Sequence, residues 1–496
     1  MDWEELIQAV PTAEVFGADR PDITGIAYDS RQVQPGNLFV CIEGSRVDGH
    51  DYIDEALSRG AVAVVVTKPV PLSPRLPSLL VSDSRKALGV LAQRFYQDPT
   101  AHLTLVGITG TNGKTTSTYM LKSILEAAGH RVGLLGTIAV VIGDVQIPAQ
   151  RTTAESLDFL QLIDQMRNQQ ITHVVAEVSS HAIALDRIVG SRYAYGLLTN
   201  VTLDHLDFHK TFDEYLKTKA SFFSQLGQGA AVNYDDEHRT SFIDSSNVPV
   251  ITYGLKEGAD VRAHHIYSTN RGTHFDVEYQ RKTVPVEIPL VGDFNVYNAL
   301  GVFAIALQMS IEPRAITKGL AQVPKVPGRF ESVEAGQDFL VIVDYAHTPD
   351  GLENVLLTAR GLVREHQGRV ICVFGCGGDR DKTKRPQMGQ VAAKLADYVV
   401  ITSDNPRSEE PERICQDIEQ GIKETGVPPL GYQRITDRLC AIKHAISVAE
   451  PGDLVLIAGK GHETYQIFKD KTIDFDDRLA ARRALGERGY DKWSIQ

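Results

Sequence analysis

The chain has 496 residues, enough for about three domains of ordinary size. Its hydrophobic fraction of 43% and charged fraction of 23% exclude a disordered, collagen-like or disulfide-scaffold protein. The formal net charge of −12 disfavours nucleic acid and anionic membranes as partners, so any bound phosphate has to be held by a local motif.

The cysteines and the amino terminus indicate a cytoplasmic protein. The five cysteines are scattered and form no C-x-x-C pair, so neither a disulfide framework nor a zinc ribbon is predicted. The segment MDWEELIQAVPTAEV is acidic and lacks the basic start and apolar core of a signal peptide. Apolar runs such as residues 61–66 are too short to cross a bilayer, so we expect no membrane insertion.

The pattern from residue 23 to residue 99 predicts a small α/β unit, which we assign to an amino-terminal domain at residues 1–100. The expected elements are strands at 25–28, 38–42 and 61–66, a helix from Tyr52, and one further strand and helix after the proline-rich segment 68–77.

After Pro99 the pattern changes to repeated strand, glycine turn and helix, which is typical of a parallel sheet covered by helices. We assign residues 101–330 to this central domain and expect strands at 103–108 and 172–176. The β-rich stretch at 249–289 is interpreted as an insertion within it.

A second alternating region predicts a carboxyl-terminal, Rossmann-like α/β domain at residues 331–496. The segment PKVPGRF, residues 324–330, is interpreted as a hinge because its two prolines interrupt any helix. The predicted fold class is therefore α/β with three domains. The expected strands of the last domain are 339–343, 370–374, 398–402 and 454–458.

The sharpest motif is GTNGKTT, which follows the strand at 103–108 and precedes a helical pattern from Ser117. Backbone amides at such a turn can cradle phosphates, Lys114 can neutralise the terminal phosphates, and the Thr115 hydroxyl can face Mg²⁺. Position 108 is isoleucine where the strict Walker pattern has glycine, so the match is to a variant; a glycine-rich turn with a surface lysine is the weaker alternative. The predicted ATP-binding residues are Gly110, Thr111, Asn112, Gly113, Lys114, Thr115 and Thr116.

Three further segments carry groups whose chemistry the sequence leaves open. Glu177 follows the strand at 172–176, where a carboxylate can hold Mg²⁺, although a solvated or ion-paired carboxylate is the common alternative. The segment NVTLDHLDFH, residues 200–209, has the composition of a metal cluster, but its spacing allows at most one or two ligands. Lys217 and Lys219, on an amphipathic helix, have the pattern of surface charges.

The motifs taken together resemble the Mur ligases, in the order of that family and over essentially the whole chain. They are GTNGKTT, EVSSH, NVTLDHLDFH with EYLKTKASFF, GDFNVYNAL (292–300), PGRFE, VDYAHTPD (343–350), GCGGDRDKTKRP (375–386), DNPR (404–407) and GKGHE (459–463). The resemblance implies a UDP-sugar domain, a P-loop ATPase domain and an amino-acid domain, and a monomer.

The resemblance also implies the reaction. It is that of an ATP-dependent amide ligase that adds meso-2,6-diaminopimelate to UDP-N-acetylmuramoyl-L-alanyl-D-glutamate through an acyl phosphate, for peptidoglycan synthesis. The alternatives are a lysine-adding member of the family or a folylpolyglutamate synthase-like ligase. A P-loop kinase or GTPase-like switch, and a non-enzymatic nucleotide-binding module, are weaker because neither explains the motifs of the last domain.

Residue by residue, the resemblance assigns a catalytic group made of Lys114, Glu177, His205 and Lys219. Two Mg²⁺ ions are expected, held by Thr115, Glu177, His205 and a carbamate that CO₂ forms on Lys219. Asn295 and Asp344 are expected near the adenine and ribose of ATP. The residues implied for the UDP-sugar dipeptide are Tyr28, Ser30, Ser45, Arg46, Val47, Thr152, Thr153, Ser179 and Arg187; the chain departs from the family at Arg151, where relatives have asparagine, and at Leu185, where they have glutamine.

The DNPR segment decides which amino acid is expected. Arg407, with Arg380, offers a planar fork for the second carboxylate of diaminopimelate, which lysine lacks. An Asx-type turn is the alternative on chemistry alone, and the resemblance favours the binding role because diaminopimelate-adding enzymes carry DNPR here. The residues expected at this amino acid are Arg380, Asp404, Asn405, Pro406, Arg407, Gly459 and Glu463.

Overall fold

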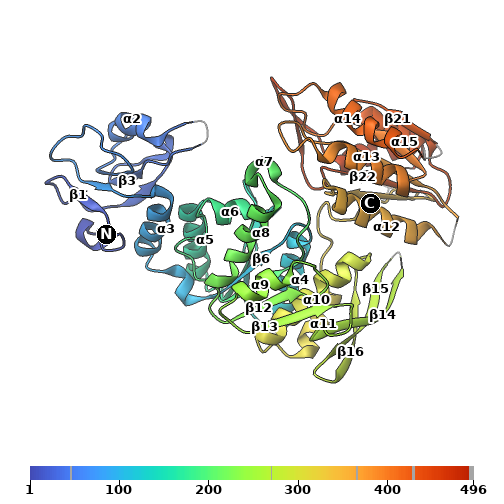
Figure 1. The fold of residues 1–496 in the computed structure, drawn as a ribbon, viewed down its shortest axis with the longest axis horizontal. Coiled ribbons are helices and arrows are strands. Elements are labelled where there is room, and N and C mark those ends of the chain that lie inside the picture. Colours follow the sequence, from blue (N-terminus) through green and yellow to red (C-terminus); the bar gives the residue numbers. More distant parts are fainter. Residues whose placement is uncertain (45–46, 270, 365–366, 427–430, 491–496) are drawn as a thin grey trace.

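The computed structural model describes residues 1–44, 47–269, 271–364, 367–426 and 431–490. Three large sheets follow one another along the described residues, each with its own helices, and Figure 1 shows the blue, green-to-yellow and orange-to-red units side by side. A separate two-stranded sheet, β23 (Tyr465–Ile467) with β24 (Thr472–Asp474), belongs to the last unit. The α/β class with three units is therefore confirmed. In the described ranges no helix combines the length and apolar character needed to span a membrane.

The amino-terminal sheet has the order β1-β5-β4-β3-β2, with β1 antiparallel to its neighbour and the others parallel. Its elements are α1 (Trp3–Ile7), β1 (Glu14–Phe16), β2 (Gly25–Ala27), β3 (Asn37–Val40), α2 (Ile53–Ser58), β4 (Ala63–Val66), β5 (Ser78–Leu80) and α3 (Ser84–Phe95). Helix α1 was not predicted, yet its Trp3 is fully buried. Leu157 and Leu160, on a helix of the next unit, complete this core.

The central sheet has eleven strands in the described residues, in the order β16-β15-β14-β13-β12-β11-β6-β10-β7-β8-β9. The strands are β6 (Thr104–Thr109), β7 (Val132–Leu135), β8 (Ala139–Ile142), β9 (Val145–Pro148), β10 (His173–Glu177), β11 (Tyr195–Leu198), β12 (Gly229–Asn233), β13 (Val250–Gly254), β14 (Val261–Thr269), β15 (Gly272–Tyr279) and β16 (Lys282–Ile288). The helices are α4 (Lys114–Ala127), α5 (Ser156–Asn168), α6 (Ser180–Ala184), α7 (Leu206–His209), α8 (Phe212–Ser221), α9 (Arg239–Ser245), α10 (Asp293–Gln308) and α11 (Pro313–Ala321).

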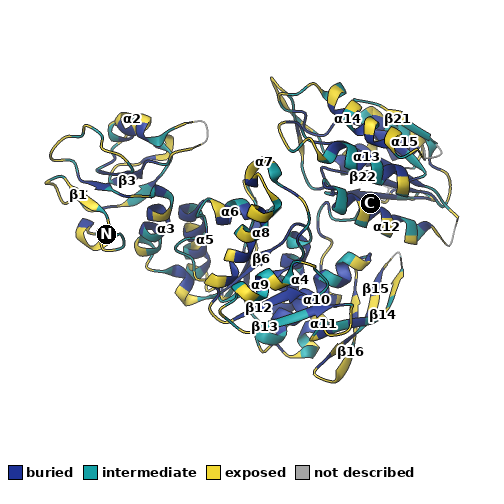
Figure 2. Cartoon of the chain, in the orientation of Figure 1, coloured by how far each residue is buried: buried dark blue, intermediate teal, exposed yellow. Residues whose placement is uncertain are grey.

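Helices cover both faces of this central sheet. One apolar core joins it to α4, α10 and α11, and a second core on the other face joins it to α5, α6 and α8. Figure 2 shows the buried centre in dark blue, whereas the edge strand β9 is exposed along its length. A parallel sheet buried on both faces explains why the strands are near-continuous apolar runs.

The interpretation of residues 249–289 as an insertion is wrong. Strand β13 pairs in parallel with β12, and β14, β15 and β16 continue the same sheet to its edge. The alternating pattern arises because these edge strands bury one face against α10 and leave the other open to solvent.

The carboxyl-terminal sheet has the order β17-β18-β22-β19-β20-β21, parallel except for β17. Helices α12, α13 and α14 share one core with it, and α15 and α16 share the other. The elements are β17 (Glu331–Ser332), β18 (Leu340–Asp344), α12 (Pro349–Val363), β19 (Val370–Phe374), α13 (Lys384–Leu395), β20 (Tyr398–Ile401), α14 (Pro411–Glu424), β21 (Gly431–Arg434), α15 (Arg438–Val448), β22 (Leu454–Ala458), β23 (Tyr465–Ile467), β24 (Thr472–Asp474) and α16 (Asp477–Glu487).

A buried ion pair fixes the loops at one end of this sheet. Arg438 and Asp477 are both fully buried and form two hydrogen bonds, of 2.8 and 2.7 Å. The same guanidinium donates to the carbonyl oxygens of Ser403 and Ala458, at 3.2 and 3.0 Å. These carbonyls lie where the loops after β20 and β22 begin, so the arginine holds two loops in place.

Replacing Asp477 with alanine is expected to destabilise the carboxyl-terminal unit by about 3–5 kcal/mol, because it leaves a buried guanidinium without its counter-charge. Urea unfolding, with hydrogen exchange read out on α15 and α16, measures this loss. The control is Asp470→Ala, which removes an exposed carboxylate of the same unit and should change stability by less than about 0.5 kcal/mol. Equal stability of the two variants would contradict the role given to the pair.

Candidate active site

The carboxyl ends of three adjacent central strands meet at one cavity. Strand β6 lies between β10 and β11, so the loops that follow the three strands are neighbours. The cavity has a volume of about 390 Å³ and is lined by these loops and by residues 344–355 of the next unit. Ligands of open α/β sheets bind in such a position.

The GTNGKTT loop is held in shape by glycines. Gly110 has φ +146° and Gly113 has φ +85°, and a Cβ would lie 1.9 Å from Thr199 Oγ1 at the first and 2.2 Å from Asn298 Oδ1 at the second. Helix α4 then begins at Lys114, earlier than the predicted Ser117, so its amino-terminal amides face the cavity. This loop is a ready anion site.

Two lysines, the partly buried Lys114 and the fully buried Lys219, meet at one oxygen of this loop. Lys114 Nζ donates to the carbonyl oxygens of Gly110 and Thr111, both at 2.9 Å. Lys219 Nζ also donates to Gly110 O at 2.9 Å, and the residue is only 1% exposed. Burial lowers the pKa of both lysines, and the charge of Lys114 lowers the pKa of Lys219 further. The surface-charge pattern of Lys219 was therefore misleading, whereas Lys217 is exposed.

Glu177 ends β10 inside the cavity with neutral partners. Thr115 Oγ1 donates to its Oε1 at 2.9 Å, Thr137 N donates to Oε1 at 2.8 Å, and Thr137 Oγ1 donates to Oε2 at 3.0 Å. The carboxylate is 1% exposed, so the solvated alternative is wrong. A buried carboxylate with neutral donors fits a cation.

The segment 200–209 sends only part of its titratable groups to the cavity. Asp204 and His205 line it, and Asp204 Oδ2 lies 3.3 Å from His205 Nε2. His205 has φ +57°, a left-handed backbone, and is the N-cap residue of the following helix α7. Asp207 instead lies 3.8 Å from Arg380, and His209 is buried outside the lining. The limit of one or two ligands agrees with this arrangement.

The linker and the carboxyl-terminal unit close the cavity. Asp344 accepts hydrogen bonds from Phe330 N at 2.6 Å and Ala346 N at 2.7 Å, and burial raises its pKa. Asn112 Nδ2 donates to Asp350 Oδ2 at 2.7 Å across the two units.

Arg329, from the segment 324–330, reaches the P-loop. Its Nη2 donates to Thr115 Oγ1 at 3.0 Å, and its guanidinium carbon lies 4.5 Å from the centre of the Tyr345 ring. The segment is thus in direct contact with the site. Movement at this linker stays a prediction.

Asn295 does not line the P-loop cavity. Its Nδ2 donates to Val291 O at 2.8 Å, and it lines a second cavity of about 560 Å³ beside the linker. Asn298, one turn later on α10, lines the P-loop cavity and accepts from Ser117 Oγ at 3.4 Å.

The DNPR loop follows β20 and the GKGHE loop follows β22, on either side of β19 in the last sheet, and the two loops share a buried lysine. Lys460 is fully buried, and its Nζ donates to Asn405 Oδ1 at 3.2 Å and Glu463 Oε2 at 3.0 Å. Asn405 Nδ2 donates to the same Glu463 oxygen at 2.9 Å. Asp404 lies 3.9 Å from the ammonium, and a Cβ at Gly459 would lie 2.8 Å from Asp404 Oδ2. Asn405 is thus already engaged by the chain and positions the two loops.

Arg407 follows Pro406 with a strained backbone and a partly free head group. Its φ is +53°, and Nη1 donates to the carbonyl oxygens of Gly378 and Asn405, at 2.8 and 3.4 Å. The side chain is half-buried, and Arg380, on the neighbouring loop, is more exposed. A left-handed arginine held by neutral carbonyls can still receive a carboxylate.

The residues expected at the dipeptide form one network beside Glu177. Thr153 Oγ1 donates to Glu177 O at 2.8 Å and to Ser179 Oγ at 3.3 Å, and Arg187 Nη1 donates to Thr153 O at 3.3 Å. Thr152 Oγ1 accepts from Thr137 Oγ1 at 3.1 Å.

Arg151 and Leu185 depart from the resemblance. Arg151 Nη1 pairs with Glu155 at 2.6 Å, which Arg187 Nε also contacts at 3.0 Å. Leu185 ends helix α6 as its C-cap residue.

The residues expected at the nucleotide lie in the amino-terminal unit. Tyr28 OH donates to Asp158 on α5 at 2.6 Å, and burial raises its pKa. Ser30 donates to Glu55 at 2.9 Å, and Val47 is exposed. Ser45 and Arg46 lie outside the described residues.

Sequence reasoning missed four residues of these clusters. Three belong to motifs it had singled out, namely Asn298 in GDFNVYNAL, Arg329 in PGRFE and Lys460 in GKGHE. The fourth, Thr137, lies two residues after the end of β7 and belongs to none of those motifs. Motif membership was the available signal for the first three, but only the packing of the strands shows which motif residues face each other.

The comparisons with known proteins agree with this geometry. The family models "Mur ligase family, catalytic domain", "Mur ligase middle domain" and "Mur ligase, glutamate ligase domain" match residues 22–96, 108–306 and 328–461. A protein of Caldanaerobacter subterraneus subsp. tengcongensis, named UDP-N-acetylmuramoyl-L-alanyl-D-glutamate--2,6-diaminopimelate ligase, is 46% identical over 474 residues, or 96% of this chain and 97% of that protein. The chain belongs to the Mur ligase family.

Two further known proteins are similar to this Mur ligase over nearly its whole length. A protein of Geobacillus thermodenitrificans with the same name is 46% identical over 98% of the chain and 100% of that protein. A solved structure of an enzyme with that name is 31% identical, with a TM-score of 0.68 and coverage of 98% of this chain and 99% of that one.

Proposed function

We propose that this Mur ligase joins meso-2,6-diaminopimelate to UDP-N-acetylmuramoyl-L-alanyl-D-glutamate and converts ATP to ADP and phosphate. The main observation is that the P-loop, Arg329 of the linker and the segment of the last unit that follows β18 face one another across one cavity. Full-length relatives named for this reaction support the choice of amino acid. The enzyme is cytoplasmic and monomeric in this proposal and supplies a peptidoglycan precursor.

The chemistry has two steps. A carboxylate oxygen of the D-glutamate takes the γ-phosphoryl group, the bond to the bridging oxygen breaks, and ADP leaves. The amine of the amino acid then attacks the carbonyl carbon, a proton is lost from nitrogen, and phosphate leaves as the amide forms. Both reactants of the first step are anions, so Lys114 and the α4 amides offset their repulsion.

Mg²⁺ fits beside this position. Thr115 Oγ1 and the Glu177 carboxylate would hold one ion. The carboxylate is buried and accepts hydrogen bonds from neutral donors of Thr115 and Thr137, so a cation beside it would balance its charge. When bound, Mg²⁺ supplies positive charge to the transferring phosphoryl group. Arg329 donates a hydrogen bond to Thr115, so its guanidinium adds a further positive charge near the transferring phosphoryl group.

Lys219 is carbamoylated in this proposal. Burial and the charge of Lys114 lower its pKa, so its ammonium loses a proton more readily. The resulting amine forms a bond from nitrogen to the carbon of CO₂ and releases a second proton, and the two steps together replace a cation beside Lys114 with an anion. His205 and that carbamate would hold a second Mg²⁺. The exchange of charge relieves the repulsion between the two lysines at Gly110 O.

The carboxyl-terminal loops select the amino acid. Arg407 and Arg380 receive the distal carboxylate of diaminopimelate, while Asp404, the Gly459 carbonyl and Glu463 receive its ammonium. Asn405 and Pro406 shape the loop. Lysine lacks the second carboxylate and leaves the arginines unpaired.

The remaining parts of the substrates are assigned to the three units of the chain in turn. Residues 1–100 hold the uridine end through Tyr28, Ser30 and residues 45–47, and Thr152, Thr153, Ser179 and Arg187 hold the muramoyl peptide. Residues 101–330 hold ATP, with Asp344 from residues 331–496 at the ribose and Asn295 near the adenine. Closure about residues 324–330 excludes water and protects the acyl phosphate.

Lys114→Ala is expected to lower kcat by about 10²- to 10³-fold or more with little change in stability, because the lysine stabilises charge that develops in phosphoryl transfer. ADP release in the presence of both acceptor substrates measures it. Lys122→Ala, on the same helix but paired with Glu126, is the control. Retention of most activity in Lys114→Ala would overturn the assignment of the ATP site.

Lys219→Ala is expected to abolish activity, whereas Lys217→Ala, two residues away and exposed, should retain it. Isotope-labelled CO₂ should give a carbamate resonance in the wild type and in Lys217→Ala that is missing from Lys219→Ala. An active wild-type enzyme without that resonance would contradict the carbamate.

With meso-diaminopimelate, kcat/KM is expected to exceed that with L-lysine by on the order of 10³-fold or more, because unpaired polar groups are costly in a built site. Arg407→Ala should remove most of this preference and leave the KM for ATP nearly unchanged. L-glutamate tests the folylpolyglutamate synthase-like alternative. Comparable values for lysine and diaminopimelate would refute the reading of DNPR while leaving the ligase activity intact.

A further inference from the structure

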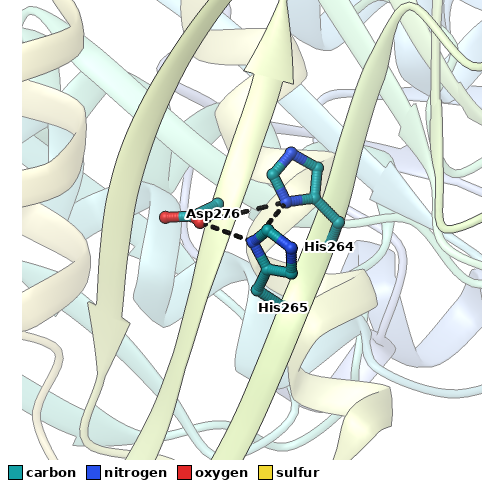
Figure 3. Close-up of side chains that lie close together, drawn as sticks. All are labelled: His264, His265 and Asp276. Carbon is teal, nitrogen blue, oxygen red and sulfur yellow. Dashed lines mark hydrogen bonds and ion pairs between the residues drawn. The ribbon is translucent and has the colours of Figure 1, made fainter.

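A second group of metal-type ligands lies on the edge hairpin of the central sheet, outside the lining of both cavities. His264 and His265 lie on β14 and Asp276 on β15, and their ligand atoms are all within 4.8 Å of one another. Figure 3 shows both imidazoles turned toward the carboxylate across the two strands. Nothing in the ligase chemistry proposed above uses these residues.

An irregularity of the strand brings the two histidines to one face. Consecutive residues of a regular strand point to opposite faces. Here the register with β15 shifts between His264 and Tyr267, and His265 has φ +51°, so both rings lie on the solvent side. His264 is the direct cross-strand partner of Asp276, which completes the group.

The spacing of the ligand atoms fits a tetrahedral ion. Nδ1 of His264 lies 3.2 Å from Nδ1 of His265, and the Asp276 Oδ2 atom lies 3.0 Å from the second ring and 3.9 Å from the first. Ligands about 2.1 Å from a tetrahedral zinc ion are about 3.4 Å apart, within the range of these three separations. The rings reach this spacing without rearrangement of the strands.

The donor set selects a class of metal. Two imidazole nitrogens and one carboxylate suit Zn²⁺ and neighbouring transition metals, whereas Mg²⁺ and Ca²⁺ prefer oxygen ligands only. The exposed position leaves room for water at the fourth position, since the side chain of His265 is 79% exposed.

A second trio of this kind, Glu43, Asp48 and His50 in the amino-terminal unit, differs because its atoms are already engaged by other groups of the protein. Asp48 is already paired with Lys68 at 2.6 Å, and His50 uses both ring nitrogens, Nδ1 with Asp48 at 2.6 Å and Nε2 with Thr67 N at 3.1 Å. That histidine has no free lone pair for a metal. The Asp276 carboxylate has no lysine or arginine partner within the described ranges.

We propose that His264, His265 and Asp276 form a surface site for Zn²⁺ or a related divalent transition metal, separate from the Mg²⁺ positions of the ligase reaction. The ion bridges β14 and β15 at the bulge and stabilises the register of the edge hairpin.

Zinc titration calorimetry on the untagged full chain, with excess Mg²⁺ to occupy oxygen-ligand positions, tests the proposal. The site is removed by His264→Ala combined with His265→Asn, since asparagine tolerates the left-handed backbone. The matched control is His274→Ala, an exposed histidine on β15 outside the trio.

The wild type and His274→Ala should bind one more Zn²⁺ per chain than the double variant. Asp276→Asn should weaken that site by more than the roughly 10- to 100-fold that loss of a hydrogen-bonding partner of a metal ligand costs. Anomalous diffraction from zinc-soaked crystals should place the ion between the three side chains. Equal zinc stoichiometry in the wild type and the double variant, or anomalous density only elsewhere, would overturn the proposal.

Discussion

The active-site region is organised around one carbonyl oxygen that receives two lysine ammonium groups, one of them fully buried. Lys114 and Lys219 both donate to Gly110 O, and neither has a carboxylate within ion-pair distance in the described residues. Such an arrangement is costly unless negative charge is added beside it, because burial and mutual repulsion both disfavour the charged forms. The glycine backbone and α4 prevent the loop from relaxing around them. The loop is therefore a preformed site for added negative charge, such as that of a phosphate group.

The sequence predicted the parts of this site that depend on local backbone. GTNGKTT between a strand and a helix needs no tertiary information, and Glu177 follows from the rule that ligands gather at the carboxyl ends of parallel strands. The order of elements was likewise predictable, because apolar runs, glycine turns and helical patterns alternate along the last two units. Lys219 was not predictable from its pattern: on an amphipathic helix it looks like its exposed neighbour Lys217, and only the resemblance singled it out.

The rest of the site depends on which strands become neighbours. Lys460 matters because β22 and β20 flank the same strand, β19, which brings GKGHE to the DNPR loop. Asn298 rather than Asn295 lines the P-loop cavity, a difference of one helical turn that periodicity cannot resolve. Residues 249–289 were misassigned for a related reason, since alternation indicates a half-exposed strand but not the sheet to which it belongs. The zinc-type group needs a one-residue register shift, which no pattern in the sequence specifies.

The linker contacts both the P-loop and the GKGHE loop of the last unit. Arg329 donates to Thr115 on the P-loop, while the preceding Gly328 approaches the GKGHE loop so closely that a Cβ would lie 2.1 Å from His462 N. Gly328 has φ +64° and its amide donates to Glu331, so this contact fixes the backbone on both sides of the arginine. A change in the backbone of residues 324–330 would therefore alter both the contact of Arg329 with Thr115 and the close approach to the loop that holds Lys460 and Glu463. One short segment thus links the P-loop to the GKGHE loop of the last unit, and reactions between bound groups depend on such fixed, short separations.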